Sequence, residues 1–230
     1  MIARPLRRTC LRLLLLLGAL TLGASEARTE TLQAALEAAG PAHGFDRWVE
    51  LTPGARYTGG LWIGATFDRL SGTFRGRGED VRIVGNGAIL DLEGGSLCIA
   101  YCANRLELED CVVVHGSVVY RGYHDAFVDL RPRGLVRYVT FWEPHDYAVR
   151  LFACGVGITL ERNLAVDAID TGPDFMYLTG EQNRWLPTGA SFSHSVQDGH
   201  HDFFDNWSFH SDPSANADMR RHFHGLCDYG

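Results

Sequence analysis

Histidine and aspartate stand side by side at the start of two similar segments, as His124-Asp125 and His145-Asp146, and Asp174 has the same place in a third. Imidazole titrates near neutrality and is often the group that moves a proton in a reaction. These pairs therefore predict acid–base chemistry, provided that the fold brings the segments together. The alternative is structural, because aspartate just before a strand is a common turn former.

The same three segments carry polar residues at equivalent positions. If they are strands stacked above one another, Asp129, Arg150 and Tyr177 share the solvent face of the stack. In such a column Arg150 is suited to neutralise a carboxylate of the substrate, while His145 acts as base and Tyr177 donates a proton.

The composition removes several kinds of chemistry. All 21 basic side chains counted as lysine or arginine are arginines. The absence of lysine excludes a Walker A lysine, a Schiff-base lysine and a lysine general base. The formal net charge is −7, which argues against a nucleic-acid partner, since nucleic-acid binding draws on a basic surface.

The first 27 residues are typical of a secretory signal peptide. Four arginines within residues 4–12 precede an apolar run over residues 13–22, and Ser25-Glu26-Ala27 offers small residues around a cleavage site. The apolar run is too short to cross a bilayer. We therefore expect a secreted protein, periplasmic or extracellular, without a membrane span, and a single domain over residues 28–230.

Five cysteines follow the leader: Cys98, Cys102, Cys111, Cys154 and Cys227. An oxidising compartment permits disulfides, and the odd number leaves at least one thiol free. The pairing stays open. Their spacing matches no zinc site.

A short helix is expected near the start of the domain. Apolar residues recur at helical spacing from Leu32, and Gly40-Pro41 ends the pattern. Beyond it the chain consists of short β-rich runs separated by glycine, aspartate, asparagine and proline, so the rest is expected to be nearly all β.

Two kinds of strand alternate along the chain. The first recurs over residues 106–114, 136–141, 158–166 and 203–209, with four residues in register: Val112, Val139, Leu164 and Trp207. The first three of them are expected to be buried above one another. The second recurs over residues 124–130, 145–151 and 173–178, with Ala217-Asp218 as the candidate start of a fourth copy. In both kinds of strand the spacing between the last two copies is about twice the usual spacing. Residues 180–201 therefore hold either one more coil or an insertion.

A repeat of this length built from short strands predicts a parallel β-helix, in which each coil lies about 4.8 Å above the previous one. Asn163 and Asn206 fall in register and suit an inward asparagine ladder at a corner. After Phe209 no second apolar helix follows. The last coil is then expected to end in a poor cap, to continue in a longer protein, or to be covered by another subunit.

Three segments resemble the opening of the right-handed parallel β-helix proteins of the pectin-lyase-like superfamily: residues 31–36, 50–59 and 81–91. The resemblance implies an all-β fold, a right-handed parallel β-helix solenoid over most of residues 29–223, with an N-terminal capping α-helix. The superfamily includes polysaccharide lyases, glycoside hydrolases, uronan epimerases and secreted proteins without assigned chemistry.

A second likeness concerns the motif Trp142-Glu143-Pro144-His145-Asp146, which resembles the Asp-Pro-His motif of alginate C5-epimerases with glutamate in place of aspartate. It implies an acid–base role for His145 and leaves Glu143 as the carboxylate. Arg184 and Trp185 are suited to grip and stack on an acidic sugar. Trp185 packed onto the wall of the fold is the alternative.

Six of the ten histidines lie between residues 194 and 224, among several aspartates. A divalent cation such as calcium is not supported by their spacing, and a solvated loop is the preferred interpretation. The sequence therefore predicts no cofactor.

Two classes of function remain. The first is a secreted enzyme acting on an acidic polysaccharide by proton abstraction, through β-elimination or C5-epimerisation. The second is a non-catalytic β-helix for carbohydrate binding or surface attachment. A glycoside hydrolase also stays open, because it needs two carboxylates about 5 to 9.5 Å apart and Asp125 and Asp146 are expected one coil apart. The oligomeric state is not predicted.

Overall fold

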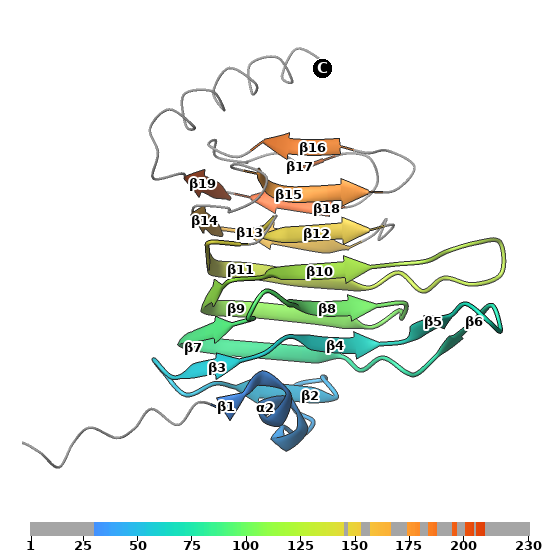
Figure 1. The fold of residues 1–230 in the computed structure, drawn as a ribbon, viewed down its shortest axis with the longest axis horizontal. Coiled ribbons are helices and arrows are strands. Elements are labelled where there is room, and N and C mark those ends of the chain that lie inside the picture. Colours follow the sequence, from blue (N-terminus) through green and yellow to red (C-terminus); the bar gives the residue numbers. More distant parts are fainter. Residues whose placement is uncertain are drawn as a thin grey trace, which may run out of the picture.

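The computed structural model describes residues 30–144, 147–152 and 157–166, and beyond them the strands and register of residues 174–179, 184–187, 195–196, 201–204 and 206–209. This part of the chain is all-β, with mostly parallel strand pairing and one short helix, α2 (Leu32–Ala38). The threonine before α2 accepts a hydrogen bond from Ala34 N at 3.1 Å, and Leu32 is fully buried. In Figure 1 α2 lies at one end of the stacked strands.

The strands form two large sheets and one hairpin. The larger sheet has eleven strands: β1 (Glu30–Thr31), β2 (Arg47–Glu50), β3 (Arg56–Thr58), β7 (Val81–Asp91), β9 (Arg105–Val114), β11 (Arg133–Trp142), β13 (Ile158–Glu161), β14 (Leu164–Val166), β17 (Ser195–Val196), β18 (His201–Phe204) and β19 (Trp207–Phe209). The second has six: β4 (Leu61–Gly64), β8 (Ser96–Ala100), β10 (Ser117–Arg121), β12 (Val149–Phe152), β15 (Asp174–Thr179) and β16 (Arg184–Pro187). The hairpin pairs β5 (Thr66–Asp68) with β6 (Thr73–Arg75).

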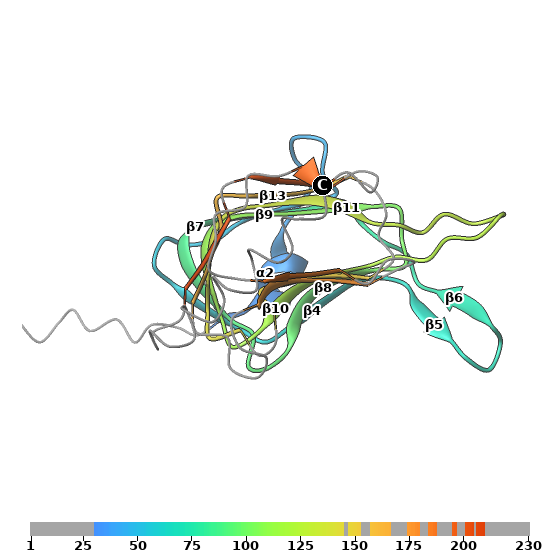
Figure 2. The same ribbon diagram turned by 90° about the horizontal axis from the view of Figure 1, so that it is seen from above.

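The chain alternates between the two sheets. From β7 to β12 consecutive strands belong to different sheets, and each of the strands β7 to β10 pairs in parallel with the strand two places further along the chain. We call one passage through both sheets a layer. Figure 2 shows the two sheets as opposite walls with the core between them, and the β5–β6 hairpin projecting beyond them. The parallel stacking predicted for residues 106–114, 136–142, 158–166 and 203–209 is confirmed.

One predicted strand of the second sheet is wrong. Residues 124–130 form a projecting loop, and β10 has the place expected for them, paired with β12. The sequence of β10 alternates inward Val118 and Tyr120 with outward Val119 and Arg121, which satisfies the period of a half-buried strand. The likeness between residues 124–130 and 145–151 therefore does not reflect equivalent places in the fold.

The predicted register of the first sheet is confirmed for Val112, Leu164 and Trp207, which are joined through Thr140, and is wrong by one residue for Val139. Val139 pairs with Cys111 and is buried, whereas Val112 pairs with Thr140 and is only half-buried. Leu164 follows Val112 in that outward row and is 37% exposed. The reason lies in the backbone at the corner.

A residue in the left-handed region marks the corner in each of these layers: Asp110 in β9, Tyr138 in β11 and Arg162 between β13 and β14, with φ of 54°, 54° and 51°. A left-handed residue breaks the alternation of inward and outward side chains. The residue after it then points inward, which puts Val112 and Leu164 on the outer surface.

The asparagine ladder is confirmed. Asn163 and Asn206 are each 1% exposed. Asn163 Oδ1 accepts from Val139 N at 3.0 Å, and its Nδ2 donates to Val136 O at 2.8 Å. Asn206 Nδ2 donates to Leu160 O at 2.7 Å. The two amides thereby tie three consecutive layers together at the corner.

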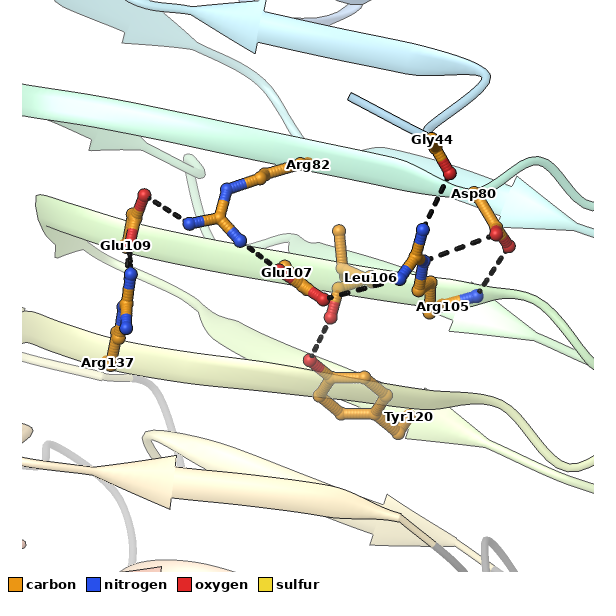
Figure 3. Close-up of polar contacts among 9 residues, drawn as sticks. All are labelled: Gly44, Asp80, Arg82, Arg105, Leu106, Glu107, Glu109, Tyr120 and Arg137. Atoms are coloured by element: carbon orange, nitrogen blue, oxygen red, sulfur yellow. Dashed lines mark hydrogen bonds and ion pairs between the residues drawn. The ribbon is translucent and has the colours of Figure 1, made fainter. Parts of the chain in front are cut away.

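An ionic ladder crosses the outer face of the eleven-stranded sheet, drawn in Figure 3. Arg82 donates to Glu107 and, at 2.6 Å, to Glu109, which also accepts from Arg137 at 2.6 Å. Partial burial acts to raise the pKa of Glu109, but the hydrogen bonds from Arg137 and Arg82 outweigh it and hold the pKa below its ordinary value. These arginines stabilise the stack because each forms ion pairs with carboxylates of neighbouring layers.

Candidate functional site

The outer face of the six-stranded sheet carries a row of register partners. Trp62 pairs with Cys98, Cys98 with Val119, and Val119 with Arg150. The row continues from Arg150 to Tyr177 on β15. These two residues were predicted to be neighbours, and their strands pair in that register. Val119 has the place predicted for Asp129, which corrects that part of the column.

A groove of about 360 Å³ lies over this row. Its lining includes Trp62, Val119, Arg121, Arg150 and Phe152. Trp62 is 46% exposed, so its indole is available at the surface of the groove. An aromatic and apolar lining with a few charged groups is typical of a ligand-binding site.

Two guanidinium groups give the groove its charge. Arg121 lies over the ring of Phe152 at 4.9 Å, and Arg150 over the ring of Tyr147 at 5.7 Å. Within the described residues Arg121 makes no ion pair, in contrast to the arginines of the ionic ladder. A planar guanidinium held against an aromatic ring is suited to bind a carboxylate in two-pronged fashion.

The thiol in the groove is not a nucleophile at neutral pH. Cys98 is 3% exposed, and its burial raises the pKa to about 12. Cys102 and Cys111 are also free and buried, and burial raises the pKa of both. Among the described cysteines the fold therefore uses thiols as small apolar side chains. Cys154 and Cys227 lie outside the described residues.

Two aspartates hold a loop together: Asp125, predicted to be catalytic, and Asp129, predicted to bind substrate. Asp125 accepts hydrogen bonds from Phe127 N at 2.8 Å, Tyr123 Oη at 2.8 Å and Val128 N at 2.9 Å. These bonds, led by the one from Phe127 N, hold the pKa of Asp125 below its ordinary value. Asp125 therefore has the structural role that was the alternative to catalysis: its carboxylate stabilises a turn.

Asp129 lies in the same loop, across an isolated β-bridge from His124. Its two carboxylate oxygens accept from Arg131 Nε and Nη2, both at 2.7 Å. This pairing lowers the pKa of Asp129 to about 2. Its carboxylate is thus engaged by its own neighbour, and its pKa is far from that of a general base working near neutrality.

The remaining predicted residues are described in part. Tyr177 and Trp185 are register partners on β15 and β16, and Leu178 pairs with Arg184. Asp174 begins β15. His145 and Asp146 lie outside the described residues.

A second polar cluster was not predicted. His115 Nδ1 lies 3.1 Å from Asp91 Oδ1, and its Nε2 lies 3.6 Å from Glu143 Oε2. Asp91 is 8% exposed and also pairs with Arg56. Burial acts to raise the pKa of Asp91, but the hydrogen bonds from Arg56 and His115 outweigh it and lower the pKa.

Arg121 and Trp62 were also missed by the sequence analysis. Strand β10 could have been found from the alternation in Ser117-Val-Val-Tyr-Arg121, which places Arg121 on the outer face. Nothing in the sequence alone sets Trp62 in the same groove, because their strands are joined only through β8.

Comparison of the chain with protein-family models, with curated proteins and with solved structures finds no match. In the described part of the chain, no group of three or more histidine, cysteine, aspartate or glutamate side chains is arranged to hold a metal ion. The described helix is too short to cross a membrane.

Proposed function

We propose that the chain is a secreted right-handed parallel β-helix of the pectin-lyase-like kind that binds an acidic polysaccharide along the outer face of its six-stranded sheet. The observation that carries the proposal is the groove in which Arg121 and Arg150 lie beside aromatic residues. The alternation of the chain between two parallel sheets supports the β-helix. The position of α2 at one end supports its role as a cap.

The charge of the groove favours a polyanion with regularly spaced carboxylates. Arg121 and Arg150 come from the neighbouring strands β10 and β12, which are separated by about 4.8 Å, and are two residues out of register, an offset of about 6.6 Å along the strands. A polymer crossing the stacked strands obliquely would meet the two cations in succession. The aromatic surface of Trp62 lies further along the same row.

A second candidate function is chemistry at the same groove. The register places Tyr177 next to Arg150 across β12 and β15. Proton abstraction beside a sugar carboxylate needs a cation to stabilise the developing charge and groups that take and return the proton. Arg150 is proposed for the first task, His145 for the base and Tyr177 for the proton donor, giving β-elimination or C5-epimerisation.

Binding is tested by titrating the purified chain with polygalacturonate, alginate and the neutral polymer dextran. We expect the two polyuronates to bind, dextran not to bind, and affinity to fall as salt rises. Arg121→Ala should weaken binding about ten-fold, as expected for loss of a charge-assisted hydrogen bond. Arg133→Ala, at an exposed position of the opposite sheet, makes the same change in net charge and should leave binding unchanged.

Equal binding of dextran and polyuronate, or equal loss in both arginine variants, would contradict the proposed groove. The second candidate is tested separately with the same polymers. Ultraviolet absorbance reports the unsaturated product of elimination, and proton NMR of the recovered polymer reports epimerisation. Binding without either product would leave the non-catalytic function alone.

A further inference from the structure

Three aromatic rings from three successive layers lie in contact at one end of the six-stranded sheet. Phe74 on β6 has its ring centroid 5.0 Å from that of Tyr101, which follows β8, and 5.0 Å from that of Tyr123, which follows β10. Phe67 on β5 adds a fourth ring, 5.1 Å from Phe74. We call Phe74, Tyr101 and Tyr123 the aromatic wall.

The aromatic wall borders the groove. Tyr101 directly follows Ala100, which pairs with Arg121, and Arg121 in turn pairs with Phe152. Tyr101 and Phe152 also pack against one small apolar cluster on the outer face of the sheet. The wall therefore continues the aromatic lining of the groove at the end of the strands where Arg121 lies.

The wall is held in place by contacts outside the groove. Tyr123 Oη donates to Asp125, whose carboxylate also accepts two main-chain N–H groups of the loop. The main chains of Tyr123 and Leu130 exchange two hydrogen bonds, of 2.8 and 3.3 Å. On the other side, an Arg75–Asp68 ion pair of 2.7 Å spans the hairpin that carries Phe74. The rings are thus ordered before any ligand arrives, which lowers the entropic cost of binding.

We propose that the aromatic wall packs against the apolar faces of successive sugar rings while the guanidinium groups of the groove pair with their carboxylates. This inference rests on the proposed function and names its ligand class: a polymer of uronic acids, recognised by its sugar rings as well as its charge. Aromatic side chains offer large rigid contact areas to the C–H surface of a sugar.

Tyr123 is the ring to remove, because it is 39% exposed and lies in a surface loop. We expect Tyr123→Leu, which keeps an apolar side chain but loses the ring, to weaken polygalacturonate binding about ten-fold, and Tyr123→Phe to bind like the parent chain. Poly-L-glutamate is the second probe, because it has carboxylates but no sugar ring. The parent chain, Tyr123→Leu and Tyr123→Phe should bind poly-L-glutamate equally, and Arg121→Ala should bind it more weakly.

Phe127→Ala is the matched control, since Phe127 is 94% exposed on the same loop and has no ring contact within the described residues. Phe127→Ala should leave the affinities for polygalacturonate and for poly-L-glutamate unchanged. The aromatic wall is wrong if Tyr123→Leu binds polygalacturonate like the parent chain, or if it loses both polymers equally while Phe127→Ala loses neither. Loss of both polymers in Tyr123→Phe as well would show that the phenol supports the loop and not the sugar.

The failures of the two proposals are distinguishable. If the parent chain binds neither polymer, the polyanion groove and the aromatic wall both fall. If Arg121→Ala weakens polygalacturonate binding and Tyr123→Leu does not, the groove stands and the wall alone is overturned. Melting curves of every variant identify any loss of binding that comes from unfolding.

Discussion

Asn163 and Asn206 share one hydrogen bond, of 2.8 Å from Asn163 Nδ2 to Asn206 Oδ1, although they are 43 residues apart in the chain. Asn206 Oδ1 also accepts from Asn163 N at 3.1 Å. The two amides therefore serve the backbone of the corner as well as each other. A buried amide of this kind contributes mainly by preventing unsatisfied polar groups.

Replacing Asn163 with valine should destabilise the fold by about 3 kcal/mol. The side chain itself fits, because the neighbouring layer has Val139 at this corner, but Val139 N and Val136 O lose their hydrogen bonds to the Asn163 amide in the interior. Urea unfolding followed by circular dichroism measures the loss. Leu164→Val, at the exposed next residue, should change the free energy of unfolding by less than about 0.5 kcal/mol. Equal effects of the two variants would contradict the ladder.

Glu109→Gln should cost about 2 kcal/mol at neutral pH, because one amide cannot accept from both Arg82 and Arg137 in their present geometry. Glu50→Gln is the control, since Glu50 is exposed and forms no ion pair within the described residues. Urea unfolding of the three proteins measures the difference. A loss no larger than in the control would show that the ladder is a solvated surface feature.

The difference in stability between the parent chain and Glu109→Gln should depend on pH. The pKa of Glu109 is lowered by folding, so its contribution is fully present above its ordinary value of 4.5 and is lost as the pH falls through the lower folded value. The stability difference between the parent chain and Glu109→Gln should therefore shrink below about pH 4.5. A difference that grows with acid has the wrong sign for a lowered pKa.

Gly134→Ala should unfold the layer at β11. An added Cβ would overlap Leu106 O and lie 2.7 Å from Tyr120 Oη, the two atoms joined by a 2.8 Å hydrogen bond. The overlap involves backbone, so relaxation requires the layers to separate, and we expect a loss of about 3 kcal/mol or more. Gly40→Ala is matched, because its Cβ meets no atom within 4 Å. Thermal unfolding compares the two, and similar melting temperatures would contradict the close approach.

Cys98 should be unreactive in the folded chain. Because burial raises the pKa of Cys98 to about 12, it carries almost no thiolate at neutral pH. Cys98→Ser should leave the number of thiols labelled under native conditions unchanged and lower the number labelled in urea by one. A reduced native count would place Cys98 within reach of reagents that enter the groove.

The sequence repeats predicted the parallel stacking, since alternation and recurring apolar positions require strands that share one core. They predicted the register of Val112, Leu164 and Trp207 but not that of Val139. They also did not predict which of these side chains are buried, because a left-handed residue at the corner, such as Tyr138, changes which residue points inward without changing the composition of the segment. The site was predicted only through Arg150 and Tyr177, whose strands do pair. The segment that contains Asp125 was wrongly aligned with residues 145–151, because aspartate is favoured in turns as well as in catalytic sites.

The ionic ladder would affect how a polyanion of the proposed kind approaches the molecule. Arg82 and Arg137 of the ladder each pair with a carboxylate, and so does Arg105 on the same face, which lies 3.2 Å from Asp80. At a distance these pairs act as dipoles, whose potential decays faster than that of a single charge. The charge of Arg121, on the opposite wall, has no such partner within the described residues. A long flexible polymer would thus be drawn in from one side, already facing the groove before the first contact forms.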